Sequence, residues 1–163
     1  MLSLVASGGQ TLWPFFIRMR LDPDRMDLRL SFWTSMASFA GLGAALAIGI
    51  VALGPQVATW MLHSQVTVPI ALMASFGLLL LVHASYYPTG MLLTDPAGLR
   101  LQAKLSIVML GCNLALSLYF AHLIGAPGPA LGSALSILLC MWLPGLSAAV
   151  VKVREAGVKM VAA

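Results

Sequence analysis

Long apolar runs alternate with short polar connections along most of the chain. The clearest pair of runs flanks the turn GAPGP at residues 125–129, with about 20 largely apolar residues on either side. About 20 apolar residues are what a helix needs to cross the hydrocarbon core of a bilayer. The tight Gly/Pro turn leaves no room for a soluble domain between the two runs. The pattern therefore predicts a transmembrane helical hairpin.

Similar runs predict two further spans, so the expected fold is an all-α membrane protein with one membrane domain over residues 1–163. The four predicted transmembrane helices cover residues 32–53, 67–87, 103–124 and 130–151. Residues 1–17 are apolar but short, and Gly8, Gly9, Gln10 and Pro14 interrupt them. We expect this segment to be the end of a membrane helix whose beginning is missing, or an interfacial segment.

Prolines and small residues predict how the spans end and pack. Pro55 and Pro88 are expected to end the first two spans, and Pro144 is expected to kink the fourth because its ring would clash with the carbonyl of Cys140. Small residues four apart lie on one face of a helix and let a neighbouring backbone approach closely. Two such stripes are predicted to be packing faces, Gly41, Ala45 and Gly49 in the first span and Gly128, Gly132 and Ser136 at the fourth.

Composition supports the membrane assignment. Sixty per cent of the residues are hydrophobic, 9% are charged, and the mean hydropathy is +0.96, whereas soluble domains carry about 25% charged residues. The net charge of +4 is concentrated in the connections between the spans. We therefore expect it to face the anionic surface of a membrane rather than nucleic acid.

The positions of the basic residues predict the topology. Lys and Arg cluster at residues 18–29, at Arg100 and Lys104, and at residues 152–159, whereas residues 54–66 and 125–129 contain none. Basic residues thus occur at every second connection, as the positive-inside rule requires. Residues 18–30, 88–102 and 152–163 are predicted to be cytoplasmic, in a multi-pass protein of the cell inner membrane with a cytoplasmic C-terminus.

Some of these basic residues are also candidates for binding. An arginine- and lysine-rich surface can meet an anionic headgroup or a lipid-linked phosphate. The alternative, which the clustering at the span ends favours, is that these side chains only anchor the topology. The candidates for contact with a substrate or headgroup are Arg18, Arg20, Arg25, Arg29, Arg100 and Lys104.

Little other chemistry is encoded inside the spans. His83 could titrate near neutral pH and serve transport, but the favoured interpretation is a neutral ring bonded to a carbonyl. Asn113 lies near the centre of the third span, where an amide needs a partner, so we expect it to face other helices and bond to one of them, with a substrate contact as the alternative. Cys112 and Cys140 are expected to fill space as free thiols.

No catalytic, phosphate-binding or metal-binding motif is found in the sequence, and no acidic residue falls within the predicted spans. We therefore expect no enzymatic activity, no cofactor and no metal. The missing intramembrane carboxylate also argues against a small dimeric multidrug exporter, which would need one to relay protons.

Two stretches resemble a known family. The segment LWPFFIRMRLDPDRMDLRLSFW is similar to a cytoplasmic crossing of the polysaccharide (O-antigen type) flippases, and LTDPAGLRLQAKLSIVMLGCNLALSLYFAHLIGAPGPALGSALSILL is similar to their late helix pair. These flippases belong to the multidrug/oligosaccharidyl-lipid/polysaccharide exporter superfamily. The shared positions would be mainly structural: Gly98, Arg100, Asn113, Gly125, Gly128 and Gly132.

The resemblance implies a MATE-like fold and transfer of lipid-linked oligosaccharides across the inner membrane. Such exporters have about twelve or more spans in two lobes, whereas four are predicted here. The chain would then be a C-terminal fragment, a truncated reading frame, or a subunit that needs a missing lobe or another membrane subunit. The alternative is a small non-transporting integral membrane protein that assembles with larger partners.

Overall fold

The computed structural model describes residue 14, residues 28–61 and residues 68–161. The elements are α2 (Leu28–Met61), α3 (Ile70–Leu92), α4 (Pro96–Ile124), α5 (Gly128–Ser136), the π-helix η2 (Ile137–Trp142) and α6 (Leu143–Val161). The last three follow one another without a break and form the fourth long helix. Four helices are long and apolar enough to cross a membrane. The predicted all-α architecture with four membrane-length helices is confirmed.

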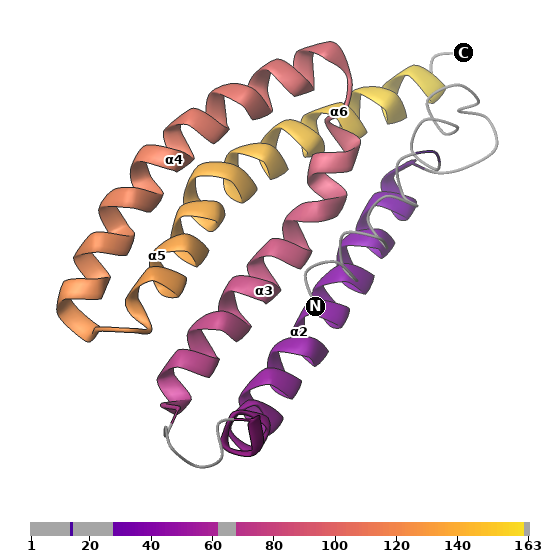
Figure 1. The fold of residues 1–163 in the computed structure, drawn as a ribbon. Helices are drawn as coiled ribbons and strands as arrows, with labels where there is room; N and C mark the ends of the chain where they lie inside the picture. Colours follow the sequence, from indigo (N-terminus) through magenta and orange to yellow (C-terminus); the bar gives the residue numbers. More distant parts are fainter. Residues whose placement is uncertain (1–13, 15–27, 62–67, 162–163) are drawn as a thin grey trace.

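The helices run alternately up and down, in the spatial order α4, α5, α3, α2 (Figure 1). The closest packing is between α2 and α3 and between α4 and α5, and α3 joins the two pairs through α5. The last helix, α6, then crosses toward α2 and contacts both α2 and α3. One end of the bundle therefore brings together the start of α2, the α3–α4 connection and α6.

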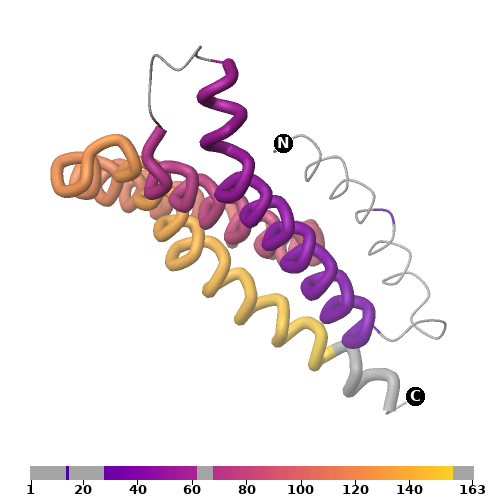
Figure 2. Tube along the Cα trace, turned by 90° about the horizontal axis from the view of Figure 1, so that it is seen from below, coloured from indigo at the N-terminus to yellow at the C-terminus, as the bar shows by residue number. Residues whose placement is uncertain are grey.

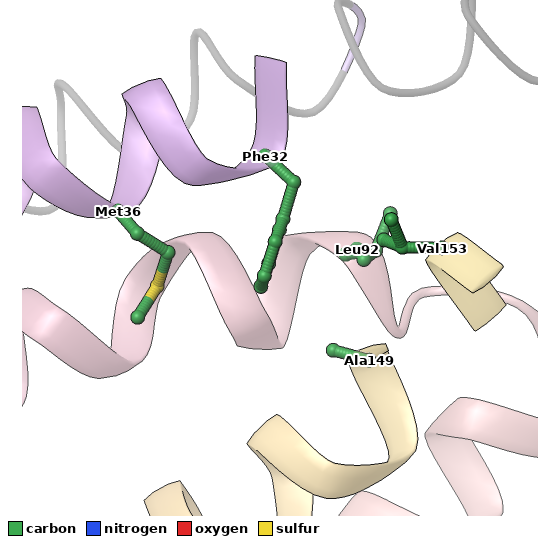
Figure 3. Close-up of a cluster of buried hydrophobic side chains, with 5 residues drawn as sticks. All are labelled: Phe32, Met36, Leu92, Ala149 and Val153. Atoms are coloured by element: carbon green, nitrogen blue, oxygen red, sulfur yellow. The ribbon is translucent and has the colours of Figure 1, made fainter. Parts of the chain in front are cut away.

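The main buried cluster lies at this end of the bundle. Phe32 and Met36 of α2, Leu92 of α3, and Ala149 and Val153 of α6 pack together there (Figure 3). A second, smaller cluster lies farther along the α2–α3 interface. Burial of these apolar side chains thus holds α2, α3 and α6 together mainly at this end of the bundle.

The first two helices are longer than predicted, because their prolines do not end them. Helix α2 continues through Pro55 to Met61, and α3 continues through Pro88 to Leu92. A proline in a membrane helix removes one N–H bond but can be tolerated where packing compensates. The side chain of Pro88 is fully buried, and α2 changes direction over its last turns (Figure 2).

Pro144 produces a π-helix in place of a simple kink. Proline lacks an N–H, so the carbonyl of Cys140 loses its usual helical donor at position 144. In the structure residues 137–142 form π-helical turns, and the N–H of Leu143 bonds to the carbonyl of Leu138, five residues back. The wider turn accommodates the proline while the helix continues.

The tight turn between α4 and α5 depends on glycine. Gly125 ends α4 with φ 73°, a left-handed conformation that glycine adopts without steric cost. Beyond the turn, a Cβ on Gly128 would lie 2.3 Å from the backbone nitrogen of Ala121, and one on Gly132 would lie 2.6 Å from that of Ser117. The stripe of Gly128, Gly132 and Ser136 therefore lies where α5 meets the backbone of α4, and Ser136 is fully buried.

The predicted stripe in the first span does not lie at a contact between the described helices. A Cβ on Gly41 or Gly49 would meet nothing of the described chain within 4 Å, and Ala45 is exposed. The close approach of α2 to α3 occurs instead at Gly43, where a Cβ would lie 2.8 Å from the Cβ of Ala84. The prediction that Gly41, Ala45 and Gly49 pack on a neighbouring helix is wrong for the helices that the structure describes.

Candidate functional site

The first candidate region is the end of the bundle where α2 begins, α3 meets α4, and α6 ends (Figure 1). The described basic residues at this end are Arg29, Arg100, Lys104, Lys152 and Arg154. The turn at residues 125–127, which has no basic residue, lies at the opposite end. The fold thus brings together basic residues that are far apart in sequence, in the arrangement that the charge pattern predicts.

Several predicted features lie outside the described residues. They are the candidate contacts Arg18, Arg20 and Arg25 and most of the apolar segment at residues 1–17. These predictions remain untested, and the basic end is discussed below from Arg29 onward.

An ion pair closes this end of the bundle. Asp95, the residue before α4, pairs with Lys152 of α6, so the α3–α4 connection is tied to the C-terminal helix. Pro96 occupies the first turn of α4, as the Asp-Pro pair predicts, but the Asp95 side chain makes no capping bond. Burial alone would raise the pKa of Asp95, but the hydrogen bond and positive charge of Lys152 outweigh it, so this pKa lies below its ordinary value of 3.8.

The lowered pKa predicts a pH-dependent contribution to stability. A carboxyl whose pKa falls on folding stabilises the protein above its unfolded pKa, and this stabilisation is lost as pH falls through the folded pKa. Asp95→Asn should lower the free energy of unfolding by about 0.5–1 kcal/mol at pH 7, as is typical of a partly exposed ion pair. Thermal unfolding in detergent at pH 7 and pH 2.5 should show a difference from the wild type that shrinks at the lower pH.

Glu155→Gln is the matched control for this experiment, because Glu155 is an exposed carboxylate at the same end. It should leave unfolding unchanged at both pH values. An equal loss of stability in both variants would contradict a specific role for the Asp95–Lys152 pair.

Gln102 organises the α3–α4 corner and was not singled out by the sequence. Its Nε2 donates to the carbonyls of Gly90 at 3.1 Å and Leu93 at 2.8 Å, and its Oε1 accepts from the Tyr86 hydroxyl at 3.0 Å. Gly98 permits the first turn of α4 to lie against the end of α3, since a Cβ at position 98 would lie 2.4 Å from the Leu93 carbonyl oxygen. A polar residue just before an apolar run gives no signal of such partners, so only the fold reveals this role.

The second candidate region is a polar cluster between α4 and α5. Asn113 Oδ1 accepts hydrogen bonds from Ser117 Oγ at 2.9 Å and Ser133 Oγ at 3.0 Å. Ser117 belongs to α4 and Ser133 to α5, so the amide links the two helices. The expected interhelical hydrogen bond of Asn113 is therefore present.

His83 is not part of either region. Its ring packs edge-on against the ring of Tyr87, with centroids 5.4 Å apart, and it makes no hydrogen bond to a carbonyl of the described chain. The expected carbonyl partner is thus replaced by an aromatic neighbour. A nearby polar contact comes from Trp142, whose Nε1 donates to the carbonyl of Ser85 at 3.1 Å.

The two cysteines are free thiols in the structure. Cys112 lies in α4 and Cys140 in η2, and both are half-buried. Among the described residues, no group of three or more His, Cys, Asp or Glu side chains is placed to hold a metal ion.

Together these features define the class as a multi-pass α-helical membrane protein with its described basic residues at one end. The chain matches no protein-family model, no curated protein and no solved structure. The fold and the two polar regions are therefore the basis of the functional argument.

Cysteine accessibility tests the predicted orientation. In a background of Cys112→Ala and Cys140→Ala, we expect Gln56→Cys and Pro127→Cys to react with an impermeant thiol reagent added to intact cells. Arg100→Cys and Lys152→Cys should react only after the membrane is opened, because positive residues are retained in the cytoplasm. Labelling of Arg100→Cys from outside would contradict this topology.

Proposed function

We propose that this chain is part of a transporter that moves lipid-linked oligosaccharides across the cell inner membrane, as the resemblance to the polysaccharide flippases implies. The observation that supports the proposal most directly is the basic end of the bundle. There α4 and α6 present Arg100, Lys104, Lys152 and Arg154, and of these Lys152 is paired with Asp95. The three remaining side chains are exposed.

The chemistry of that end suits a lipid-linked phosphate. Arginine and lysine bind phosphate oxygens through charge-assisted hydrogen bonds, and in the proposed topology these side chains lie at the membrane surface, where lipid headgroups are found. The middle of the described helices contains no acidic residue, so no carboxylate there repels a passing anion. The proposed role of the basic end is to receive the phosphate-bearing end of the lipid carrier.

The arrangement of the helices limits what one copy can do. Each described helix has neighbours mainly on one or two sides, in the order α4, α5, α3, α2. A transport path needs protein around it, and alternating access moves one repeat against another. A single copy supplies part of such an enclosure, so we propose that the transporter includes a further lobe or subunit.

Binding in nanodiscs tests the role of the basic end. We expect a polyprenyl-pyrophosphate-linked oligosaccharide to bind with an affinity that falls with salt, and the triple variant Arg100→Gln/Lys104→Gln/Arg154→Gln to weaken it at least about tenfold, which corresponds to 1.4 kcal/mol. A glycolipid without phosphate should bind weakly to both proteins. Equal binding of both lipids, or no effect of the triple variant, would contradict the proposal.

Reconstitution tests the need for a partner. One copy of the chain per liposome should not flip a fluorescent lipid-linked oligosaccharide, whereas the chain assembled with the proposed further lobe or subunit should. If neither flips nor binds the lipid, the alternative of a non-transporting membrane protein that assembles with larger partners is supported instead.

A further inference from the structure

The fourth long helix contains a segment at which it can bend. The π-helix η2 lies between α5 and α6, and Pro144 follows it closely. Membrane and soluble helices kink at π-helical turns and at prolines, and π-helical turns are frequent at functional positions. The N–H of Leu143 bonds to the carbonyl of Leu138, whereas an α-helix would pair it with Leu139. Leu143 keeps a hydrogen bond in either arrangement, so this turn can change its geometry without leaving the helix broken.

On one side of η2, helices α4 and α5 form a tightly connected unit, which we call the α4–α5 hairpin (residues 96–136). The missing Cβ atoms of Gly128 and Gly132 let α5 lie directly on the backbone of α4. Asn113 Oδ1 of α4 accepts a hydrogen bond from Ser133 Oγ of α5 at 3.0 Å. Contacts of both kinds hold the two helices at a fixed spacing.

Helices α2, α3 and α6 form a second unit on the other side. The two clusters of buried apolar side chains consist of residues from these helices, together with Trp142 at the end of η2. Among the described residues, neither cluster includes a member from α4 or α5. The apolar side chains that hold the second unit together therefore do not hold the hairpin against it.

The π-helix contacts both units, as a hinge between them must. Its Met141 Sδ accepts from Ser106 Oγ of α4 at 3.8 Å, and its Trp142 Nε1 donates to the carbonyl of Ser85 in α3 at 3.1 Å. These two contacts come from consecutive residues. The change from one unit to the other thus occurs within η2.

On the hairpin side, small residues make the contact between the two units. Ala130 and Ala134 are buried. Each lies two positions after a glycine that faces α4, which places it on nearly the opposite side of α5. Since α3 is the other neighbour of α5 (Figure 1), these two alanines face α3.

The α3 side of this contact is also small. Ser75 is buried and lies nearly opposite Gly77, where a Cβ would meet the carbonyl oxygen of Ala47 in α2. Ser75 therefore faces away from α2 and toward α5. Its hydroxyl donates to the carbonyl of Ala71 in its own helix at 2.8 Å. Moving α5 away from α3 would leave this hydrogen bond intact and would uncover only small side chains.

The basic end of the bundle fixes the point about which the hairpin can move. Gln102 ties the start of α4 to the end of α3 through the carbonyls of Gly90 and Leu93, whereas the turn at Gly125 lies at the far end. Helix α4 has 29 residues, or roughly 43 Å at 1.5 Å per residue, so a swing of only about 10° moves the turn by about 7 Å.

We propose that the α4–α5 hairpin swings as a unit about η2 and the α3–α4 corner, and so opens and closes the contact between α3 and α5 at the end of the bundle that carries the turn. The inference concerns a motion of the chain itself and does not rest on the proposed transport function. The two states share the buried clusters and the Gln102 hydrogen bonds. They differ in the arrangement of η2 and in the separation of α3 from α5, which makes the motion a hinge movement between two packed units.

Distances between spin labels, measured by double electron–electron resonance in nanodiscs, test the motion. In the full chain with Cys112→Ser and Cys140→Ser, labels at Ile70→Cys and Leu123→Cys report the turn end, where both native side chains are exposed. We expect two distances that differ by about 7 Å, the displacement calculated from the length of α4.

The matched pair Leu30→Cys and Leu99→Cys reports the basic end, where both native side chains are also exposed. It should give one narrow distance, because this end is the pivot. One narrow distance at the turn end, or equal spreads at the two ends, would overturn the proposal, and this comparison needs no hinge variant.

Two variants of the hinge test the role of η2. Deleting Leu139, a 53% exposed residue of η2, removes the extra residue of the π-helix while α5 and α6 keep their faces. Pro144→Ala keeps the length and supplies the N–H that an α-helix needs at that position. Either change should abolish the second distance at the turn end, whereas the control Pro55→Ala, at a proline of α2 outside η2, should retain it. Two distances in both hinge variants would overturn the assignment of η2 as the hinge.

Discussion

Gly132→Leu is expected to destabilise the helix assembly by at least about 3 kcal/mol, the upper range for overpacking a close interface. The added Cβ alone would lie 2.6 Å from the Ser117 nitrogen and 2.7 Å from its Cα. Backbone atoms cannot move aside as a flexible side chain can, so α5 would have to separate from α4. That separation would also break the Asn113–Ser133 hydrogen bond.

Gly111→Leu is the matched control for this substitution. Gly111 lies in α4, and a Cβ there would meet no atom of the described residues within 4 Å. Replacing a glycine inside an exposed helix segment should stabilise it by up to about 1 kcal/mol. Leu138→Ala, at a half-buried position of η2, should cost less than Gly132→Leu.

Thermal unfolding in detergent, followed by circular dichroism and by loss of monodisperse protein, measures these differences. The expected order of stability is Gly111→Leu, then Leu138→Ala, then Gly132→Leu. Equal stability of the two leucine variants would mean that the stripe at Gly128, Gly132 and Ser136 does not hold α5 against α4.

The sequence predicts the number of long helices well, because run length and hydrophobicity are properties of each segment alone. The positions of Lys and Arg likewise predict that one end of the bundle is basic, as the structure shows for Arg29, Arg100 and Lys152. The positions at which the helices end are harder to predict from the sequence. Pro55 and Pro88 were expected to end helices, but whether a proline ends a membrane helix depends on the packing around it, which involves other segments.

The packing faces depend even more on distant parts of the chain. Helix α2 contains glycines at positions 41, 43, 49 and 54, so several faces could accept a neighbour. The stripe with regular spacing was chosen, whereas α3 approaches at Gly43, because Ala84 and Leu81 lie opposite it. In the fourth span the turn at Gly125 leaves few ways to place α5 on α4, and the stripe there does lie between the helices.

The roles of some polar residues can also be predicted from one segment, whereas the roles of others depend on the whole fold. Asn113 could be identified from its depth alone, because an amide in the middle of a span needs a partner. Its serine partners, Ser117 and Ser133, follow only from the fold. Gln102 shows the reverse, since its polar surroundings in the sequence concealed a structural role at the α3–α4 corner.

Gln102→Ala is accordingly the second substitution for which we expect a large effect. It removes three hydrogen bonds, two to the carbonyls of Gly90 and Leu93 and one from the Tyr86 hydroxyl. At roughly 0.5–1.5 kcal/mol each, their loss should lower the free energy of unfolding by about 2–4 kcal/mol. The carbonyls lie at the end of α3, where no following turn of the helix can supply donors.

Two further variants distinguish the loss of these hydrogen bonds at the α3–α4 connection from the general effect of replacing a glutamine. Tyr86→Phe removes one of the three bonds and should cost about 1 kcal/mol. Gln56→Ala replaces an exposed glutamine inside α2 and should change stability by less than about 0.5 kcal/mol. The measurement is again thermal unfolding in detergent.

Amide hydrogen exchange gives an independent measurement of the same corner. In Gln102→Ala, protection should fall first in the last turn of α3 and the first turns of α4, because the lost bonds tie these two ends together. Protection of the α4–α5 turn, at the opposite end of the bundle, should be retained. If Gln102→Ala is as mild as Gln56→Ala, or if protection falls uniformly, Gln102 does not organise the corner, and the Asp95–Lys152 pair with the buried cluster around Phe32 would have to hold that end of the bundle instead.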